Sequence, residues 1–175
     1  MEVKVKKLNE RARIPTRGSD GAAGYDLYAL CEHRGIEFVQ PYKKETIHTG
    51  ISMSIPKGYF GAVFARSGLA LKEGLRPANC VGVIDSDYRG EIMITMYNDS
   101  DQRRIIEDGE RVAQIVILPC SEVEFEEADH LDETDRGGGG FGSTGKNEQC
   151  HFDDMTVEEF IEGVFPIFVD IITGK

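Results

Sequence analysis

The first 127 residues consist of short runs of β-branched and aromatic residues separated by Gly, Pro, Asn and Asp. They contain no long stretch with apolar residues at the helical period, so strands are expected and helices are not. Many short strands at this spacing predict an all-β sandwich, jelly roll or barrel with antiparallel pairing. We expect strands over residues 3–8, 25–30, 36–39, 46–55, 59–65, 81–84, 91–97, 103–106, 111–118 and 123–126.

The remainder of the chain has a different character. Residues 128–147 are acidic and contain four consecutive glycines, which predicts a mobile arm because ordering glycine costs much backbone entropy. Farther on, Thr156 as N-cap with Glu159 three residues later predicts a short helix, followed by an apolar tail. We therefore divide the chain into a β core at 1–127, an arm at 128–145 and an extension at 146–175. Within the core, Asp108-Gly109 predicts a hairpin turn.

The charge is concentrated at the C-terminal end. Of the formal net charge of −11, residues 121–175 carry most, with 3 Lys/Arg against 15 Asp/Glu, whereas residues 1–120 hold 17 against 16. An acidic tail repels DNA and RNA, which disfavours a general nucleic-acid-binding protein. The sequence has neither a run of 18 apolar residues nor an apolar leader, so we expect a soluble, intracellular protein, cytoplasmic in the first instance, and no membrane role.

Residue spacing argues against several common sites. Cysteines at 31, 80, 120 and 150 lie far apart without a CxxC pattern, which predicts reduced thiols and neither a disulfide framework nor a zinc site. The four histidines, at 33, 48, 130 and 151, show no ligand or triad spacing and are expected at the surface.

Two segments are candidates for binding a phosphorylated ligand. The run RGGGGFGSTG (136–145) offers backbone N–H groups, two hydroxyls and a guanidinium to phosphate oxygens, although a flexible linker is the alternative. It lacks the order and the strand-to-helix context of a Walker loop. ARSG (65–68) ends an expected strand with a guanidinium and a hydroxyl, which suits an anion.

Two other segments bring carboxylates to strand ends. In GVIDSDYRG (82–90) an apolar strand leads to Asp85 and Asp87, which would face the same way on an extended segment and could share a pocket or a metal. A solvated hairpin turn is the alternative. In AAGYDL (22–27), Asp26 stands at the start of a strand among small residues, and here an ordinary turn and strand is the simpler interpretation.

Together these segments resemble, in order and spacing, the five motifs of the trimeric deoxyuridine triphosphatase (dUTPase) family. The matching segments are AAGYDL (22–27), ARSGLA (65–70), GVIDSDYRGEI (82–92), GERVAQIV (109–116) and RGGGGFGSTG (136–145), within residues 1–145. The resemblance implies a distorted-barrel β jelly roll in a homotrimer, with the C-terminal arm swapped onto a neighbour's site. It also implies Mg²⁺-assisted hydrolysis of dUTP to dUMP and pyrophosphate by water attack on the α-phosphate, which keeps uracil out of DNA and supplies dUMP for thymidylate synthesis.

The resemblance also assigns roles to residues. Asp85 would hold the attacking water and the sugar 3′-hydroxyl, Tyr88 would pack under the deoxyribose, and Asp26 would bind magnesium through water. The uracil pocket would consist of Asn79, Val83, Ile84, Asp85 and Met93. Phosphates would contact Arg66, Ser67, Gly68 and Gln114, with Gln114 counted beside Asp85 in catalysis. The lid would comprise Arg136, Phe141, Gly142, Ser143 and Thr144.

The chain continues beyond the family's usual end at about residue 145. The extension is expected to clasp the trimer, to bind a protein partner or to modulate the lid. Two further alternatives stay open: a dCTP deaminase or a bifunctional deaminase-dUTPase, and a regulatory scaffold that acts through residues 146–175.

Overall fold

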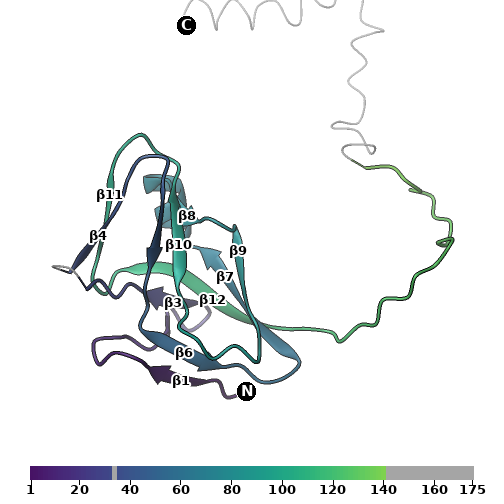
Figure 1. Ribbon diagram of the computed structural model, residues 1–175, viewed down its shortest axis with the longest axis horizontal. Helices are drawn as coiled ribbons and strands as arrows, with labels where there is room; N and C mark the ends of the chain where they lie inside the picture. Colours follow the sequence, from purple (N-terminus) through teal and green to yellow (C-terminus); the bar gives the residue numbers. More distant parts are fainter. Residues whose placement is uncertain (33–34, 141–175) are drawn as a thin grey trace, which may run out of the picture. The chain divides into compact units, whose positions relative to one another are not determined.

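The computed structural model describes residues 1–32 and 35–140, and the regular secondary structure of this part of the chain is almost entirely β (Figure 1). The predicted all-β class is therefore confirmed. Among the described residues, the only helical element is η1 (Leu69–Glu73), a single π-helical turn. The strands are β1 (Lys4–Lys7), β2 (Thr16–Arg17), β3 (Tyr25–Tyr28), β4 (Ile36–Val39), β5 (Lys44–Ile47), β6 (Ile51–Ser54), β7 (Tyr59–Ala65), β8 (Leu75–Pro77), β9 (Val81–Ile84), β10 (Ile94–Asn98), β11 (Arg104–Glu107) and β12 (Arg111–Pro119).

The strands form small antiparallel sheets. The largest has the order β2-β3-β12-β7-β9, a second has the order β5-β10-β8, and β1-β6 and β11-β4 are two-stranded. Neighbours in these sheets are often far apart in sequence, as with β4 and β11. Such non-local pairing is characteristic of sandwich and jelly-roll architectures.

The chain divides into one unit at Met1–Glu124 and a second at Phe125–Lys175. The first unit contains the hydrophobic core, which draws on every sheet. On the five-stranded sheet the inner-face residues Leu27, Ala113 and Ile115 are buried. Since buried and exposed faces alternate along a strand, the core fixes which side chains of that sheet point outward.

The expected strand at 46–55 is wrong as a single element. The structure has β5 and β6 there, because Gly50 adopts φ +67° and breaks the extended run. A Cβ at Gly50 would lie 2.6 Å from Leu30 Cδ2, so the backbone also approaches its neighbours closely at this point.

Two other local expectations need correction. Asp108-Gly109 does form a turn, with Gly109 at φ +77°, but it joins β11 to β12 in different sheets and is not a hairpin turn. Residues 123–126 form no strand in the described chain, and Phe125 is 97% exposed. The short elements β2, β8 and η1 were not expected. The helix expected at Thr156 and Glu159 lies outside the described residues.

Candidate functional site

Five of the predicted site residues line one polar pocket of about 200 Å³. We call this the polar pocket; its lining residues are Gly18, Ala22, Gly24, Asp26, Arg66, Ser67, Gly68, Arg111 and Gln114. These residues come from the loop between β2 and β3, from β3, from the turn that follows β7 and leads into η1, and from β12. The pocket therefore brings together the segments around residues 26, 66 and 114 that the sequence marked separately.

Strand register explains why these side chains meet. Gln114 is paired with Asp26 on one side and with Phe64 on the other, and paired residues in an antiparallel ladder point to the same face. The Gln114 side chain donates from Nε2 to the carbonyl oxygen of Ala65 at 3.0 Å. A Cβ on Gly24 would lie 2.6 Å from Gln114 Oε1, so glycine is needed for this close approach. The carboxamide is thus held between two neighbouring strands.

The polar pocket is centred on one carboxylate between two guanidiniums. Asp26 is nearly buried, and its Oδ1 lies 3.0 Å from Arg66 Nε while its Oδ2 lies 3.3 Å from Arg111 Nη1. A second donor of Arg66, Nη1, reaches the carbonyl oxygen of Arg111 at 3.1 Å. Two cations against one anion leave a net positive charge beside the Ser67 hydroxyl and the backbone of Gly68, and this combination suits phosphate oxygens.

A second pocket, of about 220 Å³, lies where β8, β9 and β10 come together with β7. We call it the strand-end pocket; it is lined by Val63, Pro77, Ala78, Asn79, Gly82, Val83, Ile84, Met93, Ile94 and Thr95. Most of its lining side chains are apolar, whereas the Asn79 amide, the Thr95 hydroxyl and the backbone supply a polar share of its surface. Such a site suits a flat heterocycle with a polar edge. Asn79, Val83, Ile84 and Met93, predicted together from the sequence, are brought together here.

Asp85 and Tyr88 lie in the turn that follows β9. The Tyr88 backbone N–H donates to the Asp85 carbonyl oxygen at 3.2 Å, and the Tyr88 hydroxyl donates to the carbonyl oxygen of Glu91 at 2.9 Å. The expectation that Asp85 and Asp87 share a face of an extended segment is wrong, because this segment turns. Asp85 is exposed at the end of β9.

The two pockets lie on different parts of the β core. They have no lining residue in common. By register, Asp26 and Gln114 lie on the outward side of the five-stranded sheet; of the strand-end pocket, Val63 and Gly82 lie on its core side and only Val83, on the edge strand β9, shares the outward side. A single copy of the chain thus presents the two pockets as separate surfaces.

The remaining predicted residues lie in the second unit. Arg136 donates from Nε to the Gly139 carbonyl oxygen at 2.8 Å. Phe141, Gly142, Ser143 and Thr144 lie outside the described residues.

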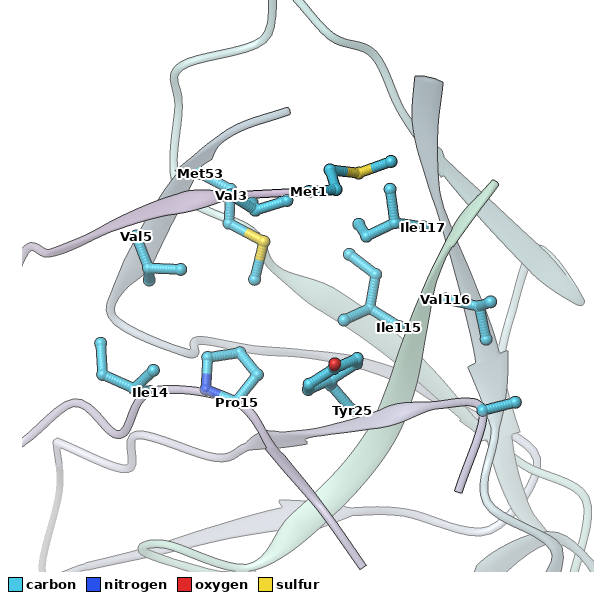
Figure 2. Close-up of a pocket in the computed structure, with 11 residues that line it drawn as sticks. Met1, Val3, Val5, Ile14, Pro15, Tyr25, Met53, Ile115, Val116 and Ile117 are labelled. Carbon is cyan, nitrogen blue, oxygen red and sulfur yellow. The ribbon is translucent and has the colours of Figure 1, made fainter. Parts of the chain in front are cut away.

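A third hollow, of about 410 Å³, is larger but chemically different. Figure 2 shows it lined by Val3, by Val5 of β1, by Met53 of β6, and by Ile115 and Ile117 of β12. Apart from Tyr25 the lining side chains are apolar, and none of them is the Lys or Arg that a phosphorylated ligand needs. We therefore do not assign the functional site to this hollow.

In residues 1–32 and 35–140, no group of three or more His, Cys, Asp or Glu side chains is arranged to hold a metal ion. Cys31, Cys80 and Cys120 are free thiols, and Cys150 lies outside this part of the chain. The described part contains no helix long and apolar enough to cross a membrane. His48 and His130 are exposed, whereas 33 and 151 are outside the described residues.

Arg111 is the charged residue of the polar pocket to which the sequence assigned no role. It lies within the segment GERVAQIV, but its partner Asp26 is 85 positions away. The motif therefore contained the residue without indicating what its side chain contacts.

Comparisons with known proteins find similar sequences and structures. The model of the family described as dUTPase matches residues 10–145. A deoxyuridine 5′-triphosphate nucleotidohydrolase of Hydrogenobaculum sp. (strain Y04AAS1) is 46% identical over 145 residues, covering 83% of this chain and 99% of that protein. The structure of the Staphylococcus bacteriophage 80alpha dUTPase with dUPNHPP aligns with a TM-score of 0.70 at 30% identity, covering 82% of this chain and 98% of that one. A mutant dUTPase from phage phi11 of S. aureus, whose structure describes a structural Mg(II) ion, aligns with a TM-score of 0.68 at 26% identity, covering 76% and 100%.

Proposed function

This chain belongs to the dUTPase family, and on that basis we propose that it is a dUTP diphosphatase, hydrolysing dUTP to dUMP and pyrophosphate. The observation that carries the proposal is the polar pocket, where Arg66 and Arg111 flank Asp26 beside Ser67 and Gln114. The relatives are named as dUTP hydrolases, so neither a dCTP deaminase nor an interaction scaffold is favoured. Because dUTP is a metabolite inside cells, an intracellular location is part of the proposal.

Each pocket has a proposed share of the nucleotide. The triphosphate takes the polar pocket, where guanidinium, hydroxyl and backbone donors neutralise charge that develops in the transition state. The base takes a strand-end pocket, with the Asn79 amide and the β9 backbone at its polar edge. Tyr88, partly exposed beside Asp85, packs under the sugar.

Asp85 is the proposed general base. Its carboxylate is exposed in the turn after β9, where it is free to accept a proton from the attacking water. General-base assistance typically contributes about 10²- to 10⁴-fold, and holding the water in line with the α-phosphorus adds an entropic advantage. Gln114 would orient the phosphates from the other pocket.

The residues fit magnesium held through water. Mg²⁺ prefers oxygen ligands, keeps several waters and is commonly bound by one or two carboxylates together with substrate phosphates. Asp26 supplies such a carboxylate, and the described residues form no larger acidic cage. When bound, the ion would add charge neutralisation on the phosphates. Asp26 would hold its waters, and Arg66 and Ser67 would position the phosphate oxygens.

A homotrimer would join the separate pockets of neighbouring copies. The outward side of the five-stranded sheet carries Phe64, Val81 and Val83 beside Gln114, and Val83 is 61% exposed. An apolar surface of this kind favours burial by another copy. In the proposal the C-terminal arm, including Arg136 and residues 141–144, closes over a neighbouring site, and residues 146–175 pack on the trimer or bind a partner.

Parallel incubations of the protein and Mg²⁺ with dUTP, dCTP, dTTP and UTP test the proposal. Pyrophosphate from dUTP is expected, with little from the others. Rejection of the 5-methyl group of dTTP by a close-fitting pocket is worth about 1 to 3 kcal/mol. Ammonia from dCTP would indicate a deaminase, and no turnover of any nucleotide would contradict the proposal.

Asp85→Asn tests the assigned base. We expect turnover to fall by about 10²- to 10⁴-fold while affinity for α,β-imido-dUTP is kept, because the amide cannot accept the proton. Asp87→Asn, two positions along the same exposed turn, removes the same charge and is the matched control with near-normal turnover. If both variants lost turnover equally, the loss would come from the change in net charge, and Asp85 would not be the general base.

A further inference from the structure

Arg111 pairs with the same carboxylate as Arg66 but at its other oxygen. Each oxygen of Asp26 has its own guanidinium, Arg66 Nε at Oδ1 and Arg111 Nη1 at Oδ2, at 3.0 and 3.3 Å. Asp26 itself is only 8% exposed. The carboxylate is thus held by two cations where one would neutralise it.

The double pairing matters when a phosphate arrives. A nearly buried carboxylate that loses its partner is strongly destabilised, because its charge is left uncompensated away from water. Arg66 can bind phosphate oxygens through Nε only by leaving Asp26 Oδ1. With Arg111 still at Oδ2, that exchange leaves Asp26 paired.

We infer that Arg111 is a positioning residue that holds Asp26 and so allows Arg66 to pass from the carboxylate to the triphosphate. The inference rests on the proposed function, since it takes the polar pocket as the triphosphate site. The exchange also frees Oδ1 to accept a hydrogen bond from a water, including a magnesium-bound one. The Arg111 carbonyl oxygen, 3.1 Å from Arg66 Nη1, steadies the guanidinium as it turns.

The test compares Arg111→Met and Arg111→Lys with a control arginine. Arg11 lies in a similar ion pair, 3.2 Å from Asp108 Oδ2, with its side chain 49% exposed against 48% for Arg111, and it does not line the polar pocket. Arg11→Met therefore removes an arginine–aspartate pair of similar length elsewhere in the β core, together with the Arg11 donors to the Cys31 carbonyl oxygen. Pyrophosphate binding is measured by calorimetry without Mg²⁺, and α,β-imido-dUTP binding with and without Mg²⁺.

Arg111→Met is expected to weaken both ligands and to lower kcat/KM by about 10- to 100-fold, the usual effect of losing a group that orients a site's first contacts. The Mg²⁺ concentration needed for half-maximal nucleotide binding should rise as well. Arg111→Lys, which keeps the charge near Oδ2, should recover part of the loss, and Arg11→Met should change each value by less than about twofold.

A double-mutant cycle separates positioning from direct contact with phosphate. If Arg111 acts through Asp26, Arg111→Met made in an Asp26→Asn background has little further effect, since the charge it compensates is gone. Single-turnover release of pyrophosphate at high enzyme concentration keeps weak variants measurable. Additive losses would show that Arg111 binds phosphate directly and would overturn the inference, as would an Arg111→Met variant that behaves as wild type.

Failure of the inference and of the proposed function are distinguishable. If the unmodified protein does not hydrolyse dUTP, the proposed function fails. If it does and the cycle is additive, only the positioning role of Arg111 fails.

Discussion

Gly24 is the position where the addition of one methyl group should most directly disturb the polar pocket. A Cβ there would lie 2.6 Å from Gln114 Oε1 and 3.2 Å from Gln114 Cβ and Cδ. The backbone of Gly24 is not at positive φ, so Gly24→Ala introduces no dihedral strain and its effect comes from this contact alone. Gln114 must therefore move.

The magnitude follows from what Gln114 loses. Turning its carboxamide away breaks the 3.0 Å bond from Nε2 to the Ala65 carbonyl oxygen, worth about 0.5 to 1.5 kcal/mol. If the same displacement removes a phosphate contact of about 1.4 kcal/mol, kcat/KM falls about tenfold.

Thermal unfolding and dUTP kinetics together check this. Gly21→Ala is the control, because a Cβ at Gly21 would meet no atom within 4 Å and the residue lies in the same loop. Gly24→Ala should unfold at a lower temperature and show reduced kcat/KM, whereas Gly21→Ala should match the wild type. A Gly24→Ala protein with unchanged kinetics and unfolding temperature would refute the argument that this close approach holds Gln114 in place.

Two further predictions concern the core. Burial, reinforced by the nearby carboxylates of Glu37, Asp108 and Glu110, raises the pKa of the Cys31 thiol to about 11. Alkylation at pH 8 to 9 should therefore modify the exposed Cys80 but spare Cys31 until the protein is unfolded. Because the folded pKa lies above the ordinary value of 9.0, the free energy of unfolding should also fall as the pH rises from about 9 toward 11, and rapid labelling of Cys31 in the native protein at pH 8 would contradict both expectations. Asn98→Ala should destabilise the protein by about 1 to 3 kcal/mol in urea unfolding. The reason is that the buried Asn98 amide donates to two carbonyl oxygens, at 3.0 and 2.7 Å, and these would lose this donor. A change below about 0.5 kcal/mol would show that water replaces the lost amide donor.

The sequence predicted most strands because their signal is local. Runs such as β7 and β12 alternate or are continuously apolar over several residues, and the β-branched content alone favours extension. Pairing is different, since β11 and β4 meet across more than 60 positions and no short window records that contact. The single expected strand over β5 and β6 failed for a related reason: the apolar pattern continues through Gly50, and only its positive φ separates the two strands.

The candidate site was predictable as a set of residues but not as a geometry. The resemblance brought in Asp26, Arg66 and Gln114 by motif, and these lie together in the polar pocket. It did not indicate that Arg66 and Arg111 share one carboxylate, because that depends on the register of β3 against β12 and on the end of β7. Likewise, the residues around Asp85 were expected to be extended, whereas they form a turn closed by the hydrogen bond from the Tyr88 N–H to the Asp85 carbonyl oxygen.

The outward side of the five-stranded sheet links stability to chemistry in the proposed assembly. The ladder that aligns Gln114 with Asp26 also aligns Phe64 with Val81, so charged and apolar groups share one surface by register. Covering Val81 and Val83 with a second copy would remove apolar area from water and also exclude water from the margin of the polar pocket. Ion pairs and phosphate contacts strengthen as the local dielectric falls, so the burial that holds the copies together would also increase the stabilisation of charge on the triphosphate. Because the polar and strand-end pockets of one copy lie apart, the same assembly would bring a base pocket from one chain to a phosphate pocket of another.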